Sequence, residues 1–536
     1  MERRKFLKTT ALAATAPILF NHIPVLASSQ IESSNLQMMA TAAQECGKIL
    51  VIIQLNGGND GLNSVFPLDQ YDKLTAARAN ILMNESDVLK LNLNNSTGFH
   101  PAMTEMQKMY NNGQMMIVQG VTYPNPSYSH FRSTDIWFTA SDADKSLQTG
   151  WLGRALDNKF PNFPIGYPSA DMPDPLAIQI GSTLPFSLQG PKINLAYSVP
   201  SPDDLLNVIN ATTDPAPSSD YGKELTFLRL MKDQSNVYRT VIKNAYDVPS
   251  PQSAAYPNNK LAQQLKIVAK LINGGLQTPI YIVNHPKSFD SHEYQVTDTD
   301  KKTGKQADNL KILSDAVAAF QKDLRIIGKS EKVTGMTFSE FGRRIKSNGS
   351  LGTDHGAGAP VIFFGDSLNV GASNVVGSAY PVSGMIGKSP LLPDVATVED
   401  QVPMQFDFRQ IYSTIMQDWL CMTEDQATNV LGAKFDKLPI FKTKKASSLT
   451  DVDNDIFVIY PNPVMGNQVN IRFTNAISSR INIMIANIQG ANIYEDSFQV
   501  DGKFIDFYIN TYVASGTYIL RLTLNGSFYF KKLMIQ

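Results

Sequence analysis

Short runs of consecutive apolar residues alternate with segments of helical periodicity through residues 48–440. The first run, at 48–55, ends in a loop rich in Gly and Asn, which is typical of a buried parallel strand that enters a functional loop. Strands that alternate with helices predict an α/β fold, a mostly parallel sheet flanked by helices, over residues 48–441. The other predicted strands lie at 115–121, 280–283, 333–338 and 361–364, and the predicted helices at 225–246, 261–272, 310–327 and 408–420.

The pattern changes at about residue 442. Residues 442–454 are polar and weakly patterned, which indicates a linker. Residues 455–536 then carry short runs of mostly alternating polarity separated by Gly, Asn or Asp, so we expect a small antiparallel β-sandwich there. Two stretches of the α/β region, 158–220 and 284–307, are rich in Pro, Ser, Asp and Gly and are expected to form long loops or insertions over the sheet edge.

The first 27 residues have the order of a signal peptide. Arg3, Arg4, Lys5 and Lys8 precede an apolar run at 11–26, and cleavage is expected near Ala27. Prolines and polar residues interrupt that run, so it makes a poor membrane anchor. The string ERRKFLK at 2–8 resembles the twin-arginine export signal, which implies the twin-arginine machinery as a partner. Residues 28–47 are small and polar and are expected to be a spacer.

The end of the chain resembles a known sorting signal. The strings YPNP at 460–463, SGTY at 515–518 and FKKLMIQ at 530–536 are similar to the C-terminal sorting domain of the type IX secretion system. The resemblance implies the type IX machinery as a second partner. The protein is then expected to pass the periplasm and reach the cell surface or the exterior. An accessory β domain that binds carbohydrate or packs on the first domain remains the alternative.

Composition excludes some classes of function. The chain is 43% hydrophobic and 18% charged, and its mature form carries a formal charge of about −4, so we expect no nucleic-acid partner. No segment after the signal is long and uncharged enough to span a membrane. The two cysteines, Cys46 and Cys421, can form at most one bridge, and neither lies in a motif.

Candidate chemistry gathers where predicted strands end. Loops at the C-terminal ends of parallel strands meet at one edge of a sheet, so residues distant in sequence become neighbours there. Carboxylates and imidazoles on such loops are the ligand set of zinc or a similar divalent ion, and two ions would suit ester hydrolysis. The candidate ligands are Asp60, Asp290, His292, Glu340 and His355.

Simpler interpretations stay open for several of these residues. Asp60 also suits an Asx turn before Gly61, and Glu340 can pair with Arg343 or Arg344. His130 suits a ligand, an acid catalyst or a structural histidine. His100 and His285 each precede a proline and carry no usable signal.

Six short motifs are spread across residues 48–440: LNGGNDGLN at 55–63, QGV at 119–121, SHFRS at 129–133, GWLGR at 150–154, FSEFGRR at 338–344 and GTDHG at 352–356. Together they resemble the DUF1501 family, which is grouped with the alkaline phosphatase and sulfatase superfamily. The resemblance implies a metal-dependent hydrolase of phosphate or sulfate esters, acting on an unknown ester or a surface polymer. A binding or assembly protein with a degenerate metal site is the alternative.

The same resemblance implies a nucleophile at a helix N-terminus. Ser129 is the candidate, with Ser127 and Ser133 behind it, and Arg132 would bind a phosphate or sulfate oxygen pair. Ser129 as a simple helix cap is the alternative. The superfamily has an aspartate and a histidine where this chain has Glu340 and Phe341, which puts a second metal in doubt.

Overall fold

The structure is a computed structural model of the full chain. It describes two short strands, β1 (Ile18–Phe20) and β2 (Ile23–Val25), and residues 46–536 apart from 93, 170–171, 201–215, 217, 252–253, 371–383, 443–455, 488–491, 510–512 and 525–526. The chain divides into two compact units, Cys46–Lys442 and Thr443–Gln536, with Met1–Glu45 assigned to the second. We call them the α/β unit and the β unit.

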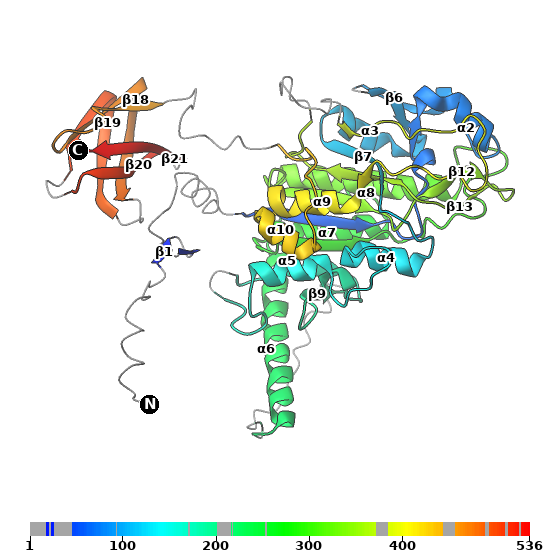
Figure 1. The fold of residues 1–536 in the computed structure, drawn as a ribbon, viewed down its shortest axis with the longest axis horizontal. Coiled ribbons are helices and arrows are strands. Elements are labelled where there is room, and N and C mark those ends of the chain that lie inside the picture. The colour runs from blue at the N-terminus through cyan, green and yellow to red at the C-terminus, as the bar shows by residue number, and fades with distance from the viewer. Residues whose placement is uncertain are drawn as a thin grey trace, which may run out of the picture. The chain divides into compact units, whose positions relative to one another are not determined.

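A nine-stranded sheet forms the centre of the α/β unit (Figure 1). All neighbouring pairs are parallel except the two made by β14, which runs opposite to both β7 and β11. The expected mostly parallel sheet is therefore confirmed. In spatial order the strands are β15 (Met385–Ile386), β7 (Met115–Thr122), β14 (Ala359–Phe364), β11 (Val333–Phe338), β3 (Ile49–Gln54), β10 (Ile280–Asn284), β8 (Ala177–Ile180) and β9 (Ala196–Val199), with β16 (Phe406–Asp407) also on β7.

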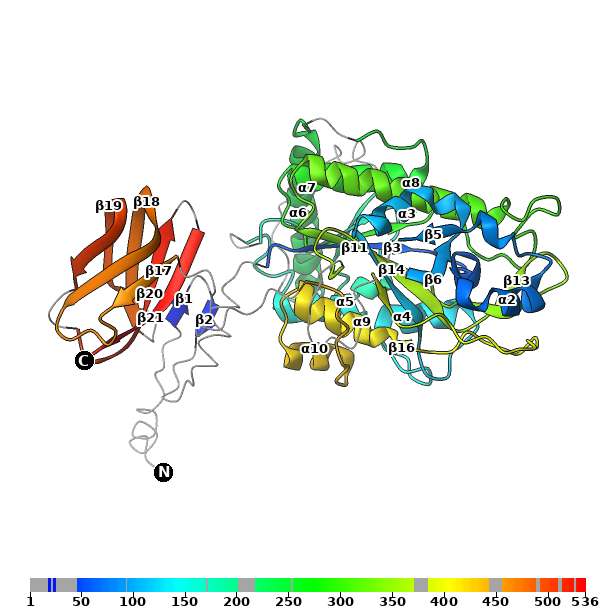
Figure 2. The ribbon, with the colours of Figure 1, turned by 90° about the horizontal axis from the view of Figure 1, so that it is seen from above.

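Helices cover both faces of the sheet (Figure 2). The side chains of β3 alternate between two apolar cores: Leu50 and Ile52 face one, and Val51 and Ile53 face the other. Because both faces are buried, the strand is continuously apolar, as its sequence indicated. One core includes residues of α4 (His130–Thr139), α5 (Trp151–Lys159), α9 (Phe408–Thr414) and α10 (Glu424–Leu431); the other includes residues of α3 (Thr104–Asn111), α6 (Asp220–Asp247), α7 (Lys260–Asn273) and α8 (Lys305–Ile326).

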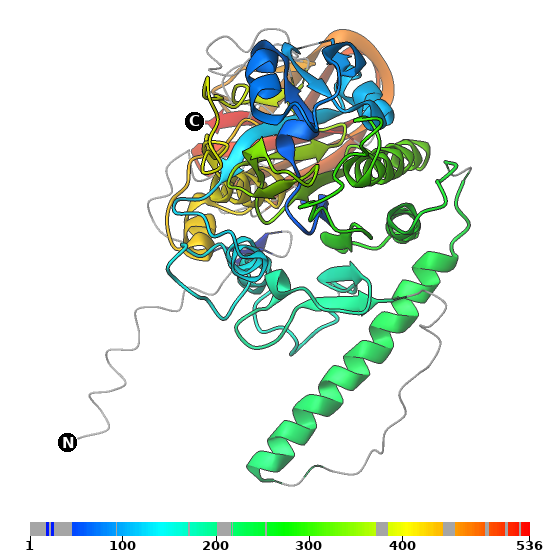
Figure 3. The same cartoon turned by 90° about the vertical axis from the view of Figure 1, so that its right-hand side faces the viewer.

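The helices agree closely with the sequence pattern, and capping residues account for several of their ends. Asn259 caps α7 through the Ala262 amide, and Asp407 begins α9 in a capping box with Gln410. The segment expected as one helix at 408–420 is α9 followed by a π turn at Ile415–Trp419. Helix α6 is long and extends away from the sheet in Figure 3.

One expectation needs correction. Residues 158–220 were expected to be long loops or insertions over the sheet edge, but they contain β8, the edge strand β9 and the start of α6. Each of these two strands has only four residues and is flanked by Pro, Ser and Gly, so the flanking residues favoured a loop prediction. Smaller elements complete the unit: α2 (Tyr71–Arg78), the sheet of β4 (Val65–Pro67), β5 (Leu89–Leu91) and β6 (Asn94–Phe99), and the hairpin of β12 (Arg343–Ser347) and β13 (Thr353–His355).

A disulfide joins Cys46 to Cys421, a pairing that the sequence left open. It connects the residue that begins the α/β unit with the turn after Trp419, whose indole nitrogen donates to the Ile49 carbonyl. The first strand is therefore fixed to the last helical region of the same unit. No helix in the described part of the chain has the length and hydropathy of a membrane span.

The β unit is one antiparallel sheet that curls around a single apolar core. The expected small all-β domain is thus confirmed. Its long strand β18 joins two of the short runs that the sequence pattern showed as separate. Because β18 pairs with β17, β19 and β20, it organises the whole sheet. The strands are β17 (Phe457–Tyr460), β18 (Gln468–Asn487), β19 (Asn492–Tyr508), β20 (Gly516–Leu524) and β21 (Ser527–Ile535).

Candidate metal centre

Loops from five strands meet at one edge of the α/β sheet. Strands β3, β7, β10 and β11 run in the same direction, so the loops that follow them leave from this edge. Strand β14 runs in the opposite direction, so the hairpin that precedes it arrives at the same edge. Topology thus collects His130, Asp290, His292, Glu340 and His355, which span more than 200 positions of sequence.

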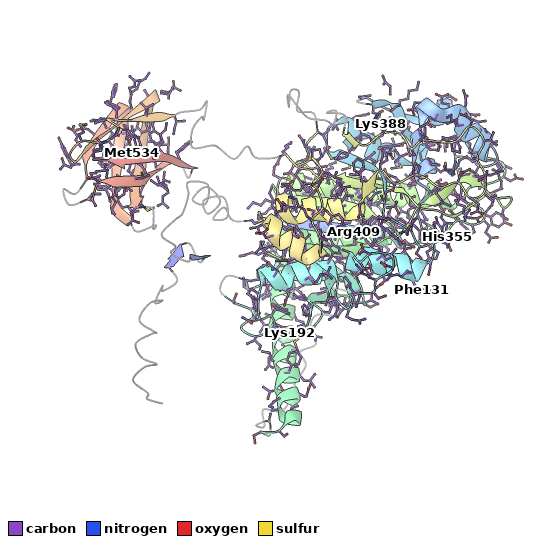
Figure 4. All side chains as sticks on the ribbon, in the orientation of Figure 1. Phe131, Lys192, His355, Lys388, Arg409 and Met534 are labelled. Carbon is purple, nitrogen blue, oxygen red and sulfur yellow. A yellow bond between two sulfur atoms is a disulfide. The ribbon has the colours of Figure 1, made fainter. Side chains whose placement is uncertain are left out.

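Three imidazoles surround the carboxylate of Asp290. The Nε2 atoms of His292 and His355 lie 3.4 and 3.5 Å from its Oδ1, and Nε2 of His130 lies 3.6 Å from its Oδ2. The Nε2 atoms of His292 and His355 lie 2.9 Å from each other. We call these four residues the His/Asp cluster. Figure 4 shows His355 at the same end of the unit as Phe131, the exposed residue that follows His130.

The second ring nitrogen of each histidine faces a hydrogen-bond acceptor. Nδ1 of His130 lies 2.7 Å from the Glu340 carboxylate, and Nδ1 of His292 lies 3.1 Å from that of Asp354. Nδ1 of His355 lies 2.7 Å from the backbone carbonyl of Tyr128. Such acceptors fix the orientation and tautomer of metal-binding histidines, because they hold the proton on Nδ1 and leave Nε2 free to bind.

The close approach of His292 to His355 follows from these partners. A carbonyl only accepts, so Nδ1 of His355 carries a proton, and the Asp354 carboxylate assigns the same tautomer to His292. Each neutral ring then presents a lone pair on Nε2. Two lone pairs 2.9 Å apart repel each other unless a proton or a cation lies between them.

Three donor atoms of the cluster, from Asp290, His292 and His355, fit corners of one tetrahedral ion. Zinc with bonds of about 2.0–2.1 Å has ligand atoms about 3.3–3.4 Å apart. The separations between Asp290, His292 and His355 are 2.9–3.5 Å, so the three atoms already lie near the corners of such a tetrahedron. His130, Asp290 and His355 offer ligand atoms that all lie within 4.8 Å of one another. Imidazole and carboxylate together suit zinc and related divalent ions.

Arg343 fixes Asp290 from the protein side. Its guanidinium is fully buried and donates to Oδ1 of Asp290 at 2.8 Å. It also donates to the carbonyls of Gly57, Gly58, Phe289 and Thr353, and so ties together three of the loops that form the edge. Gly57 allows this approach, since a Cβ there would lie 2.4 Å from the Asp290 amide nitrogen.

Neighbouring groups control the charges of the cluster. Burial alone would raise the pKa of Asp290, but the hydrogen bond and charge of Arg343 outweigh it and lower that pKa. The Glu340 hydrogen bond raises the pKa of His130, whereas burial lowers the pKa of His355. The cluster therefore presents an ionised carboxylate beside a neutral His355 imidazole at neutral pH.

Asp60 does not join the His/Asp cluster. Its buried carboxylate accepts two hydrogen bonds from Nη1 of Arg78, at 2.8 and 3.0 Å, and one from Gln295 at 2.7 Å. It also accepts from the amide of Leu62, which is the Asx-type turn that the sequence offered as the alternative. The expected convergence of Asp60 with His355 is corrected accordingly: a buried ion pair satisfies this carboxylate.

Glu340 lies behind the cluster instead of inside it. The side chain is fully buried, and its Oε1 accepts from His130 Nδ1 and from the amide of Gly57 at 2.8 Å. The next residue, Phe341, packs its ring against the imidazoles of His130 and His355 and adds no ligand. Among the described residues, a ligand set for the expected second ion is therefore not assembled.

The expected anion-binding arginine is engaged elsewhere. Arg132 donates to the Asp135 carboxylate on its own helix and to the carbonyls of Asp142, Ala143 and Lys145. Its guanidinium holds the loop after α4 and is not turned to the cluster. This corrects the role expected for Arg132 as a clamp on phosphate or sulfate oxygens.

The serine candidates differ in their surroundings. Ser129 is exposed at the N-cap of α4, next to His130, and its side chain makes no capping hydrogen bond. Ser133 is buried and bonds to the Ser127 carbonyl and the Tyr123 hydroxyl, and Ser127 accepts from the Ser129 amide. Ser129 thus remains the candidate with an exposed hydroxyl beside the cluster.

Sequence reasoning undervalued three participants. For His130 the sequence left a ligand, an acid catalyst and a structural histidine open, and the structure places it at the start of α4, after the buried strand β7. Asp354 lies directly before His355, and Arg343 lies three residues after Glu340. The pairing of Asp354 with His292 across the edge had no sequence signal, because these residues are 62 positions apart.

Two family models match parts of the chain. Residues 252–432 match the family described as protein of unknown function, DUF1501. This DUF1501 segment contains Asp290, His292, Arg343 and His355, while His130 precedes it. Residues 458–536 match the secretion system C-terminal sorting domain. The sorting domain expected from the sequence is confirmed, and it implies the type IX secretion machinery and indicates export to the cell surface or extracellular space.

Comparison with curated proteins gave no significant match. Many solved structures overlap with the chain, among them the following three. PorZ of Porphyromonas gingivalis, a surface component of the type IX secretion system, is 17% identical with a TM-score of 0.13, over 18% of this chain and 13% of PorZ. The sulfatase PsFucS1 of Pseudoalteromonas is 12% identical over 90% of this chain and 88% of its own, with a TM-score of 0.29.

The third structure comes from work on glycosaminoglycan metabolism in Bacteroides thetaiotaomicron. It is 10% identical over 84% of this chain and 90% of its own, with a TM-score of 0.32. All three TM-scores lie below 0.5.

Proposed function

We propose that this exported protein binds one divalent ion, with zinc the best match, in the His/Asp cluster and hydrolyses phosphate or sulfate esters outside the cell. The observation that carries the proposal is the convergence of three Nε2 atoms on one carboxylate while every Nδ1 atom faces an acceptor. A structural histidine has no need for two anchored nitrogens of this kind, and three together are the pattern of a metal site.

The residues divide into those that bind the ion and those that orient these ligands. His130, His292, His355 and Asp290 supply the ligand atoms. Glu340, Asp354 and the Tyr128 carbonyl fix the imidazole rings, and Arg343 fixes the carboxylate. When bound, a zinc ion acts as a Lewis acid that polarises an ester oxygen and lowers the pKa of a water molecule.

One ion fits this chain better than two. Asp60, one of the five expected ligands, is paired with Arg78, and Glu340 is hydrogen-bonded to His130. The guanidinium of Arg343 supplies a permanent positive charge next to Asp290. The two-ion mechanism suggested by the sequence is therefore replaced by a one-ion mechanism.

Access and charge suit an anionic substrate. The side chains of Asp290 and His292 are 38% and 45% exposed, so a substrate reaches the cluster from solvent. Ser129 places an exposed hydroxyl at the start of α4, where helix amides favour an anion. In this proposal the Ser129 oxygen attacks the phosphorus or sulfur, the bond to the leaving alcohol oxygen breaks, and that alcohol takes up the proton released by Ser129; water then cleaves the ester formed on Ser129.

A second candidate function is a metal-stabilised surface protein without catalysis. The observation that favours it is the engagement of Arg132 with Asp135 and three carbonyls, which leaves the expected anion clamp unfilled. A protein of this kind would bind the ion and hydrolyse nothing.

Elemental analysis and ester hydrolysis of the purified mature protein test both candidates. We expect one zinc per chain, hydrolysis of p-nitrophenyl phosphate or sulfate, and loss of both in His355→Ala without loss of fold. His100→Asn is the matched control, because it changes a histidine outside the cluster and keeps a capping side chain before Ala102. Metal without hydrolysis would select the surface protein, and absence of metal would reject both candidates.

The export route is part of the proposal. Residues 2–8 lie outside the described part of the chain, and the twin-arginine assignment rests on their ERRKFLK string alone. We expect cleavage near Ala27 and accumulation of uncut precursor when Arg3 and Arg4 are both changed to Lys. Mass spectrometry of the exported protein tests this, and an intact Met1 would refute it.

A further inference from the structure

The three strings that resemble a sorting signal meet in one place in the β unit. Strand β20 begins within the SGTY string and pairs with β21, which contains most of the FKKLMIQ string, so that Thr517 lies opposite Met534. The other edge of β21 meets the segment that starts with YPNP, where Val464 forms a parallel bridge with Ile535. Figure 4 labels Met534 on this strand. The end of the chain therefore lies between the other two strings.

The side chain of Asn462 pairs with the backbone of β21. Its Nδ2 donates to the Lys532 carbonyl at 2.8 Å, and its Oδ1 accepts from the Met534 amide, also at 2.8 Å. Two residues later the backbone repeats this pattern: the Val464 amide donates to the Met534 carbonyl at 2.7 Å, and the Val464 carbonyl accepts from the Gln536 amide at 3.0 Å. The carboxamide of Asn462 therefore takes the place of a peptide group in a short parallel ladder.

The residues on either side of Asn462 explain why a side chain makes this contact. Pro461 and Pro463 have no backbone N–H, so neither can donate a hydrogen bond to a neighbouring strand. An asparagine side chain carries a donor and an acceptor in one planar group, as a peptide group does. A carboxamide between two prolines thus continues the ladder along β21 where the backbone of its neighbours cannot.

The position of β21 determines which side chains at the end of the chain reach solvent. Leu533 and Ile535 are buried in the apolar core of the β unit. Because successive side chains of a strand point to opposite faces, Lys532, Met534 and Gln536 lie on the other face, and the first and last of these are exposed. A partner of the folded β unit meets these three side chains, whereas a detached tail would also present the two apolar ones.

We propose that Asn462 is a positioning residue of the sorting signal: its carboxamide holds β21 in the sheet, and a protein of the type IX machinery binds the surface so formed. On this surface Lys532, Met534 and Gln536 face outward beside the start of β20. The simpler role for the same contact is protection of a strand edge, since an unpaired edge invites pairing with other chains. The inference is independent of the proposed hydrolysis, because all of its residues belong to the β unit.

Asn462→Ala removes both side-chain hydrogen bonds to β21, and Asn470→Ala is the matched control. The Asn470 amide also donates to a backbone carbonyl of the β unit, that of Tyr460, at 3.0 Å, but this carbonyl lies outside β21. Met534→Pro is a second variant that removes the contact from the other partner. The Met534 amide donates to Asn462, so proline deletes this bond and leaves the amides of β21 that pair with β20.

Sorting is measured with the full chain in cells that carry the type IX machinery, as the ratio of surface and secreted protein to periplasmic protein. Docking of the strand end is measured on the purified full chain by the rate at which carboxypeptidase releases Gln536, and stability is measured by urea unfolding. We expect Asn462→Ala and Met534→Pro to lower the sorting ratio about tenfold and to speed the release of Gln536 by a similar factor. Asn470→Ala should match the wild type in both measurements.

Normal sorting of Asn462→Ala together with faster release of Gln536 would overturn the proposal, because the machinery would then read the tail as a detached segment. An equal loss of sorting in Asn470→Ala would also overturn it, since the overall stability of the β unit would then control export. If Asn462→Ala unfolds the β unit, sorting of the folded Met534→Pro chain decides in the same way. Loss of sorting in Asn462→Ala with the urea midpoint of the Asn470→Ala control is the supporting result.

Discussion

Replacing Glu340 by glutamine distinguishes the role of Glu340 in orienting the metal ligand His130 from its role in folding. Oε1 of Glu340 accepts from Nδ1 of His130 at 2.7 Å and from the amide of Gly57 at 2.8 Å, inside a fully buried environment. Glutamine keeps the shape and one acceptor oxygen but removes the negative charge. The imidazole of His130 then loses the charged partner that holds its Nδ1 proton and raises the electron density on Nε2.

The structure sets the expected size of the effect. Loss of an outer partner of a metal-binding histidine costs about 10–100-fold in metal affinity, which corresponds to about 1.4–2.7 kcal/mol. Folding of the metal-free protein suffers less, by about 1–2 kcal/mol, because a charge-assisted buried hydrogen bond becomes a neutral one and the oxygen still accepts one bond.

Zinc affinity is measured by competition with a chromogenic chelator, and stability by urea unfolding of the metal-free protein. Glu105→Gln is the control, since Glu105 is exposed and pairs only with Lys108 on the same helix. Unchanged zinc affinity in Glu340→Gln would show that Glu340 does not orient a ligand. It would also contradict the role of His130 as a zinc ligand. A loss of affinity equal in both variants would point to general electrostatics.

Three further predictions follow from the same contacts. The Glu340 hydrogen bond raises the pKa of His130 above its ordinary value of 6.5. In the metal-free protein this bond therefore contributes stability that is complete below pH 6.5 and is lost as pH rises through the raised pKa. The difference in unfolding free energy between wild type and Glu340→Gln, measured from about pH 5 to 9, should shrink with rising pH, and a constant difference would contradict the prediction. Replacing Cys46 and Cys421 by serine should lower the free energy of unfolding by about 2–4 kcal/mol in urea titrations, because the bridge closes most of the α/β unit into one loop; an unchanged midpoint would assign it no role in stability. Deleting residues 456–536 should leave a folded α/β unit inside the cell envelope, as fractionation and limited proteolysis would measure, whereas arrival of the truncated chain at the surface would place the sorting signal elsewhere.

Local pattern was sufficient for the five central strands of the α/β sheet, β7, β14, β11, β3 and β10. The runs at 115–121 and 333–338 are strands because a strand buried on both faces is apolar throughout, and the helix at 261–272 shows its buried face through its spacing. Strands β8 and β9 were missed because four residues between loop-forming segments give too short a signal.

Candidate ligands were found from the sequence where they lie on loops at the ends of predicted strands. Asp290, His292 and His355 lie on loops at one edge of a parallel sheet, and their residue types alone suggested a metal. Asp60 satisfied the same criteria, yet its carboxylate is paired with Arg78. Sequence spacing does not reveal which cationic side chain pairs with a buried carboxylate, because the partner of Asp60, Arg78, lies on a separate helix.

The sequence by itself determined the fold class, the sorting domain and the residue types of the cluster, since these depend on periodicity and short motifs. Only the tertiary structure decided that His130 faces Asp290, that Arg343 is buried beside it, and that Glu340 lies one contact behind. The reason is physical: the antiparallel direction of β14 and the pairing of β7 with it bring together loops that are more than 200 residues apart. Hydrogen bonds between those loops, which no local pattern encodes, then orient each side chain.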